Sequence, residues 1–108
     1  MMHYFLETTH LSEIMEASDK EPVIIFKYSS ECGSSDRLLT KLEKSIKEKS
    51  LKAPVYKVTV QIHKALSAKI AEMFEVKHQS PQILILNKGK LTYTAHHNSI
   101  KIEEFVIG

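Results

Sequence analysis

The sequence predicts one α/β domain in which a mixed β-sheet is flanked by helices. Three observations lead to this prediction. Short runs of β-branched and other apolar residues alternate with longer segments whose apolar residues recur every three or four positions. Two strand-like runs near the C-terminal end flank a turn signal, which indicates a hairpin. All 3 prolines stand immediately before a β-rich run, where a missing N–H disturbs a sheet least.

A short helix and a buried strand are expected near the start of the chain. Leu11 and Ile14 stand at helical spacing, and Thr9 precedes them as a candidate N-cap. The run 23–26 is too short for a helix and rich in β-branched residues. We expect it to form a strand buried on both faces that ends near Lys27.

Two longer amphipathic helices and a second strand are predicted next. A helix of about four turns begins at Ser34 or Ser35, because leucine and isoleucine recur along it while charged residues fill its other face. The alternation within Val55–Val60 predicts the second strand. The helix after that strand places four residues in the core: Leu66, Ile70, Met73 and Phe74.

The last third of the chain predicts a hairpin and a final helix. Gln82–Leu86 and Leu91–Thr94 read as strands, and the segment 87–90 between them contains Asn, Lys and Gly in a turn pattern. Ile100–Val106 places apolar residues on one helical face. The early βαβ pattern implies parallel strands and the hairpin adds antiparallel ones, so the predicted sheet is mixed.

Composition and charge exclude several classes of protein. A chain of 108 residues has the size of one domain, here 1–108, and 43% hydrophobic with 26% charged residues is typical of a globular protein. The net charge of +2 is far below what nucleic-acid binding favours. No apolar run approaches the roughly 20 residues of a membrane span, and no secretory signal is evident. We therefore expect a cytoplasmic monomer that binds neither nucleic acid nor membrane.

Cys32 is the single cysteine, so an internal disulfide is excluded and any redox chemistry uses one thiol. It falls between the buried strand and an amphipathic helix, where free N–H groups of the first helical turn favour the thiolate. Because the thiolate is the nucleophile, Cys32 is the candidate catalytic residue. A buried cysteine without function is the alternative. The 6 histidines lack metal-ligand spacing, so no metal site is predicted.

The predicted strand is followed by Cys32-Gly33-Ser34-Ser35 and a helix, and Ser80-Pro81 and a hairpin come later. This order of motifs along the chain resembles the thioredoxin fold. The site reads Cys-x-x-Ser in place of Cys-x-x-Cys. Within that fold, the segments 26–32 and 76–82 resemble the monothiol bacilliredoxin-type family of the bacillithiol system. The second segment is the more specific, since the family typically reads Val-Lys-His-Glu-Ser-Pro-Gln there. Gln79 departs from this pattern, as does Gly33, because the family often has proline after its cysteine.

The resemblance implies roles for three residues around Cys32. Pro81 is the cis-proline that faces the active cysteine, although the sequence alone does not distinguish it from an ordinary trans proline. Ser80 offers backbone groups to an extended substrate. Ser35 stands where a dithiol enzyme has its second cysteine, and its hydroxyl either hydrogen-bonds the thiolate or only caps the helix.

Charged and titratable side chains are further candidates for binding the substrate. The family commonly has lysine at the position of Lys27. This side chain either brings positive charge toward the cysteine or a carboxylate-bearing ligand, or is simply solvated. Arg37, Lys77 and His78 are candidates for contacting ligand carboxylates. His97, in the loop after the hairpin, either donates a proton to a leaving thiolate or is solvated.

Three functions are compatible with these residues. The first, which the resemblance favours, is a monothiol oxidoreductase that uses Cys32 to remove a low-molecular-weight thiol, bacillithiol, from S-thiolated client proteins, with no cofactor besides this co-substrate. The second is an iron–sulfur carrier like the Cys-Gly-Phe-Ser glutaredoxins, which residues 32–35 match at three of four positions. The third is a non-catalytic thioredoxin-like interaction module, for which the pKa of Cys32 would not be lowered.

Overall fold

The computed structural model describes residues 5–102. Helices and strands alternate along the first part of the chain, and a hairpin follows. In chain order the elements are α1 (Leu11–Lys20), β1 (Val23–Tyr28), α2 (Gly33–Lys47), β2 (Val55–Thr59), α3 (Lys64–Met73), β3 (Gln82–Asn87), β4 (Lys90–His96) and a 3-10 helix, η1 (His97–Ser99).

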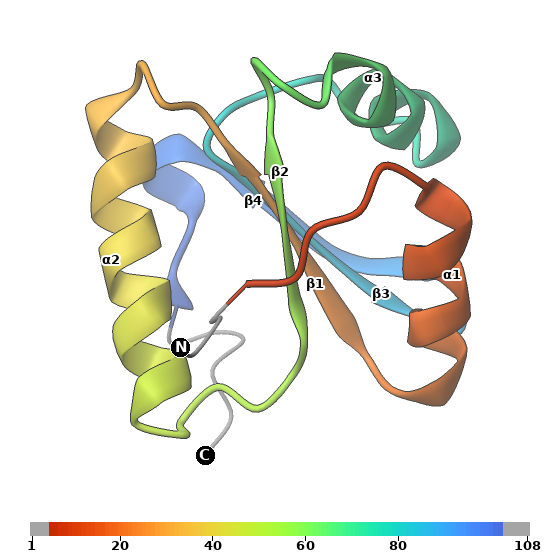
Figure 1. Ribbon diagram of the computed structural model, residues 1–108, viewed down its shortest axis with the longest axis horizontal. Helices are drawn as coiled ribbons and strands as arrows, with labels where there is room; N and C mark the ends of the chain where they lie inside the picture. Colours follow the sequence, from red (N-terminus) through yellow and green to blue (C-terminus); the bar gives the residue numbers. More distant parts are fainter. Residues whose placement is uncertain (1–4, 103–108) are drawn as a thin grey trace.

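The strands form one mixed sheet with the order β2-β1-β3-β4. β1 runs parallel to β2 and antiparallel to β3, and β4 runs antiparallel to β3. α2 covers one face of this sheet, whereas α1 and α3 cover the other (Figure 1). This arrangement confirms the predicted fold class, a mixed sheet with parallel and hairpin strands flanked by helices.

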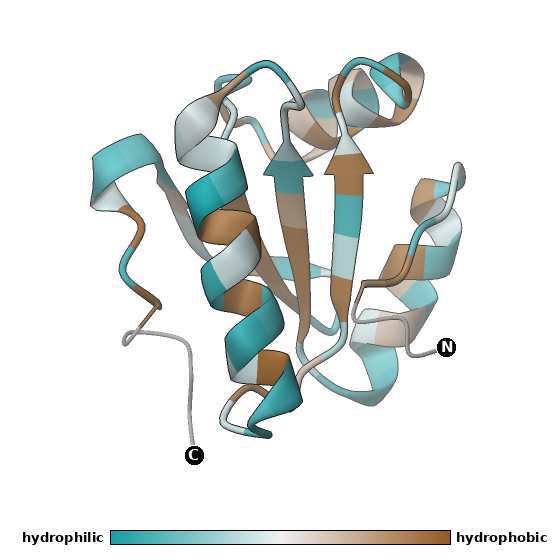
Figure 2. Cartoon of the chain, turned by 60° about the vertical axis from the view of Figure 1, so that its left-hand side comes forward, coloured by the Kyte–Doolittle hydropathy of each residue, from teal (hydrophilic) through white to brown (hydrophobic). Residues whose placement is uncertain are grey.

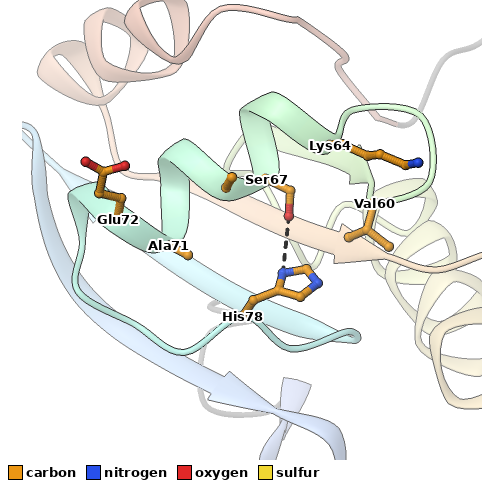
Figure 3. A pocket seen from close by; sticks show the side chains of 7 residues that line it. Val60, Lys64, Ser67, Ala71, Glu72 and His78 are labelled. Carbon is orange, nitrogen blue, oxygen red and sulfur yellow. Dashed lines mark hydrogen bonds between the residues drawn. The ribbon is translucent and has the colours of Figure 1, made fainter.

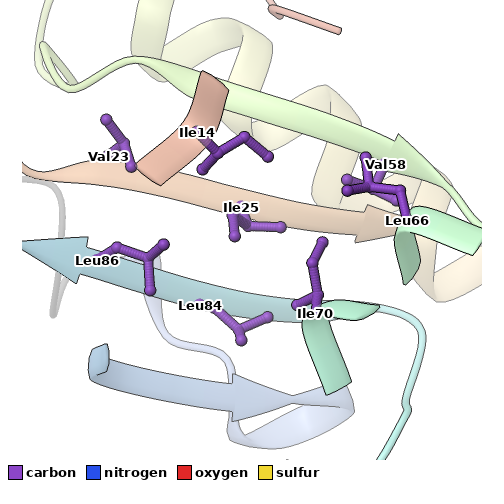
Figure 4. Close-up of a cluster of buried hydrophobic side chains, with 8 residues drawn as sticks. All are labelled: Ile14, Val23, Ile25, Val58, Leu66, Ile70, Leu84 and Leu86. Carbon is purple, nitrogen blue, oxygen red and sulfur yellow. The ribbon is translucent and has the colours of Figure 1, made fainter. Parts of the chain in front are cut away.

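The two faces of β1 belong to two separate cores. Ile25 points into the core under α1 and α3, whose buried members appear in Figure 4. Phe26 points into the core under α2, where it packs with Leu38 and Leu42. Apolar and polar residues alternate along α2, as Figure 2 shows, so one side of the helix is suited to this core. The alternation of side chains along a strand therefore places Lys27 on the side of α1 and α3.

The hairpin turn has the two-residue form that the turn signal predicts. Lys88 and Gly89 have positive φ angles of 51° and 74°, the conformation of a type I′ turn that favours glycine. The hydroxyl of Ser18 accepts a hydrogen bond from the Gly89 N–H at 2.9 Å. Its carbonyl accepts another from the Lys88 N–H at 2.7 Å. The turn is thus attached to α1.

Several local predictions were wrong. Met73 was predicted to lie in the core but is 54% exposed; it is the last residue of α3, and Phe74 just beyond the helix packs against the core instead. Thr9 is not the N-cap of α1, because the helix begins one residue later, after His10. α2 begins at Gly33, before the predicted start at Ser34 or Ser35.

The predicted helix at 100–106 lies mostly outside the described residues. In the part of the chain that is described, the segment after β4 forms the short helix η1. Across residues 5–102, no helix is both long and apolar enough to cross a membrane.

Candidate active site

Cys32 occupies the N-cap position of α2, where the sequence predicts it. Its backbone is extended, and its carbonyl accepts hydrogen bonds from the N–H groups of Ser35 and Asp36 at 3.1 and 3.2 Å. The thiol is partly exposed. Hydrogen bonding by the Ser35 backbone N–H lowers the pKa of Cys32 below its ordinary value, and the Ser34 N–H and both serine hydroxyls act in the same direction. Partial burial opposes this shift without cancelling it. The site therefore favours the nucleophilic thiolate.

Ser35 has a second contact besides the thiol. Its side chain is fully buried, and its hydroxyl oxygen accepts a hydrogen bond from the Ser29 N–H at 3.2 Å. The hydroxyl thus connects the first turn of α2 to the loop that follows β1. Both contacts go beyond simple helix capping, which was the alternative for this residue.

Gln61, which sequence reasoning missed, holds the same loop from the segment after β2. Its amide nitrogen donates to the Ser29 hydroxyl at 2.7 Å, and its amide oxygen accepts from the Ser30 N–H at 3.3 Å. A polar residue in a loop gives no periodic signal, so its partners 31 and 32 positions away could be found only in the structure.

The Ser80–Pro81 peptide bond is cis, as the resemblance implied, and no other cis bond occurs within residues 5–102. The carbonyl of Pro81 accepts a hydrogen bond from the His97 N–H at 3.1 Å. Pro81 and His97 also line a cleft of about 220 Å³ that reaches Ser34, the second residue after Cys32. The structure thus brings the predicted Pro81 and His97 to the end of α2 that carries the cysteine.

This cleft, which we name the α2 cleft, lies between α2 and the chain after β4. Its lining residues are Ser34, Arg37, Leu38, Lys41, Pro81, His97, Asn98 and Ile100.

Lys27 is fully buried, so the alternative interpretation of Lys27 as a solvated side chain is wrong. Its ammonium donates to the carbonyl of Ser67 at 3.0 Å and to Nδ1 of His78 at 3.3 Å. Burial lowers the pKa of Lys27 to about 8. The pKa of His78 is also lowered, by burial and by the charge of Lys27. The ammonium is thus engaged with α3 and His78, on the face of the sheet opposite α2.

A second cleft, the α3 cleft, has a volume of about 590 Å³. Figure 3 shows His78 and Ser67 pointing toward one another within it, with Ser67 Oγ and His78 Nδ1 3.3 Å apart. Its lining residues are Val60, Lys64, Ser67, Ala68, Ala71, Glu72 and His78. His78 therefore lies apart from Arg37, which was also proposed to contact ligand carboxylates, because the two residues line different clefts.

No group of three or more His, Cys, Asp or Glu side chains is placed to hold a metal ion in residues 5–102. The chemistry that the described side chains offer centres on Cys32, a thiol with a lowered pKa at the start of α2, and on the cis-proline Pro81, which lines a cleft together with Ser34. This combination, on a mixed sheet with helices on both faces, defines a thioredoxin-fold protein with a thiol redox site.

Solved structures agree with this fold. A protein with a thioredoxin fold gives a TM-score of 0.80 at 21% identity, over 95% of this chain and 94% of its own. Oxidised mitochondrial thioredoxin 3 from Saccharomyces cerevisiae gives 0.72 at 21% identity, over 94% of this chain and 92% of its own. Fasciola hepatica thioredoxin gives 0.73 at 19% identity, over 93% and 91%.

The family is more specific than the fold. Residues 5–105 match the family described as monothiol bacilliredoxin BrxC, and the chain belongs to this family. Family and fold together support a thiol redox function and a redox enzyme, and the single cysteine fits monothiol chemistry.

Proposed function

We propose that this protein removes bacillithiol from mixed disulfides on client proteins, with Cys32 as the nucleophile. The observation that carries the proposal is the state of this thiol: it is partly exposed at the start of α2, its pKa is lowered by N–H and hydroxyl groups, and it is the single cysteine of the chain. A second protein thiol is therefore not needed for the reaction. Family membership supports bacillithiol as the small thiol.

The reaction has two exchange steps that balance. The Cys32 thiolate attacks the bacillithiol sulfur of the mixed disulfide; that disulfide breaks, and the client sulfur leaves as a thiolate and takes up a proton. Cys32 then carries bacillithiol in a new disulfide. A second small thiol, as its thiolate, attacks the bacillithiol sulfur, forms a small-molecule disulfide and releases the Cys32 thiolate.

Other residues contribute to these steps. Ser80, directly before the cis bond, offers backbone groups to the extended client segment. The imidazole of His97, which lines the cleft next to Ser34, supplies the proton to the leaving client sulfur.

Mass spectrometry of the Cys32 adduct tests this proposal. Wild type and Cys32→Ser are each mixed with a client protein that carries bacillithiol, and with the same client carrying glutathione. We expect the bacillithiol mass on wild-type Cys32, none on the variant, and weak transfer from the glutathione client. Equal transfer from both clients would contradict bacillithiol specificity, and no adduct from either, with a folded and reduced protein, would reject the proposed reaction.

The iron–sulfur alternative is checked on the same preparation. Protein purified without oxygen is expected to be colourless, whereas a bound cluster would colour it brown and bring two chains together.

A further inference from the structure

The α2 cleft, which reaches Ser34 in the first turn of α2, carries positive charge. Arg37 and Lys41 line it from successive turns of α2, and His97 and Asn98 line it from η1. No aspartate or glutamate is among its described lining residues. All four of these side chains offer N–H donors, so the cleft is suited to an anion with several acceptor oxygens.

The nearest carboxylate in the sequence is already engaged elsewhere. Asp36 directly precedes Arg37, but its Oδ1 accepts a hydrogen bond from the Tyr28 hydroxyl at the end of β1. Arg37 instead donates from Nη2 to the hydroxyl of Ser34, two residues after Cys32, at 3.3 Å. A neutral hydroxyl leaves the guanidinium charge without an anionic partner in this contact.

The α3 cleft does not have this excess of positive charge. Small apolar side chains such as Ala68 and Ala71 line it, and Lys64 is accompanied there by Glu72. An anionic ligand would meet a carboxylate in the α3 cleft but none from the described lining of the α2 cleft. The charge distribution therefore favours the α2 cleft over the α3 cleft as the binding site for an anion.

The distances along α2 suit a small thiol. A helix rises 1.5 Å per residue, so Arg37 and Lys41 lie about 7.5 and 13.5 Å along the axis from Cys32. Their long side chains can reach back toward the sulfur. The volume of about 220 Å³ is smaller than the roughly 300 Å³ at the low end of sites that hold a whole drug-sized ligand. The cleft is suited to one charged end of the ligand.

We propose that the α2 cleft binds the carboxylate end of the low-molecular-weight thiol while its sulfur reacts with Cys32. Arg37 and Lys41 provide the charge, and the amide of Asn98 donates a hydrogen bond. The inference rests on the proposed function, since it assigns a binding site to the same small thiol.

Two small symmetric disulfides that differ in charge test the proposal. The disulfide of mercaptosuccinate carries carboxylates, and the disulfide of mercaptoethanol carries none. The measured quantity is the ratio of their rate constants for forming an adduct on Cys32. We compare wild type with a double variant that combines Arg37→Gln and Lys41→Gln. The control is Lys44→Gln, which removes an exposed charge from α2 outside the cleft.

We expect the ratio of anionic to neutral rates to fall about tenfold in the double variant, as the loss of two partly exposed ion pairs would produce. Lys44→Gln should keep the wild-type ratio, and added salt should lower the ratio in wild type. An unchanged ratio in the double variant, or an equal fall in Lys44→Gln, would overturn the proposal. The pKa of Cys32 in each variant, from thiolate absorbance, accounts for any change in the nucleophile itself.

A binding measurement keeps the test independent of exchange chemistry. S-methyl mercaptosuccinate is titrated into Cys32→Ser and followed by amide NMR shifts. Saturable shifts at 37–41 and 97–98 are expected, and their absence would overturn the proposal. If these shifts and the charge preference occur but wild type takes no bacillithiol from a client protein, the proposed function fails while the anion site stands.

Discussion

The two faces of the sheet use polar groups in opposite ways. On the α2 face, Cys32 is partly open to solvent, and neutral N–H and hydroxyl donors lower its pKa. On the α3 face, Lys27 is fully buried, and its neighbours are a carbonyl and an imidazole. The first arrangement stabilises the charge of a thiolate that solvent can reach, whereas the second buries an ammonium that solvent cannot reach.

Both arrangements act on the same short segment before β3. Lys27 holds His78 from one side, and the His97 N–H holds the Pro81 carbonyl from the other. The segment that carries the cis bond is therefore attached to the sheet interior and to the end of the hairpin. A buried lysine can thus support the active site without contacting the cysteine.

The largest expected effect concerns the buried charge. Replacing Lys27 by Met removes a cation whose pKa is lowered from 10.5 to about 8 by burial. Below pH 8 the lysine is protonated in both the folded and the unfolded state. There, the lowered pKa means that burying the charged ammonium reduces the free energy of unfolding by about 3 kcal/mol. Between pH 8 and 10.5 the unfolded state binds more protons, so wild-type stability gains from Lys27 as pH rises.

Urea unfolding across this pH range checks the prediction. The free energy of unfolding of wild type relative to Lys27→Met should rise between pH 8 and 10.5. Thiol–disulfide exchange by the Lys27→Met variant should be slower, because His78 loses the hydrogen bond that the Lys27 ammonium donates. A constant difference in stability across the range would show that the lysine is not buried as a cation.

Ser35→Ala tests the opposite face of the sheet. It removes one donor to Cys32 and leaves the Ser29 N–H without its acceptor, so the free energy of unfolding should fall by about 2 kcal/mol. The pKa of Cys32, read from thiolate absorbance, should rise toward its ordinary value. Ser34→Ala is the matched control and should shift this pKa less, since the Ser34 hydroxyl has the smaller influence. Equal shifts in the two variants would refute the assigned roles.

Gln61→Leu is expected to have a smaller effect on the α2 face. The loop before Cys32 loses its hydrogen bonds to the Ser29 hydroxyl and the Ser30 N–H, which should lower the free energy of unfolding by about 1 kcal/mol. Faster alkylation of Cys32 by iodoacetamide should accompany the loosening of the loop. Unchanged stability and alkylation would indicate that the loop keeps its form without the glutamine.

The smallest effect is expected at Met73, the last residue of α3. Met73 is exposed, so Met73→Ser should change the free energy of unfolding by less than about 0.5 kcal/mol. Ile70, one turn earlier, is fully buried, and Ile70→Ala should cost about 2 to 5 kcal/mol. Thermal or urea unfolding of the two variants measures the contrast. A comparable loss in both would place Met73 in the core after all.

Much of the fold follows from patterns that neighbouring residues produce. The apolar run of β1, the periodicity of α2 and the hairpin turn at Lys88–Gly89 all appear where expected. The placement of Cys32 at the start of α2 follows from the same patterns, because a loop between a strand and a helix must leave the first helical N–H groups free. The signal failed at element ends, where Met73 kept the helical spacing but lay beyond the buried part of α3.

The sequence by itself determined the order of the elements, the mixed sheet and which thiol is available for redox chemistry. Only the tertiary structure decided that Lys27 is buried against Ser67 and His78, 40 and 51 residues away, and that Arg37 shares a cleft with His97. Helix and strand patterns arise from residues a few positions apart, whereas these contacts depend on how separate elements pack across the sheet.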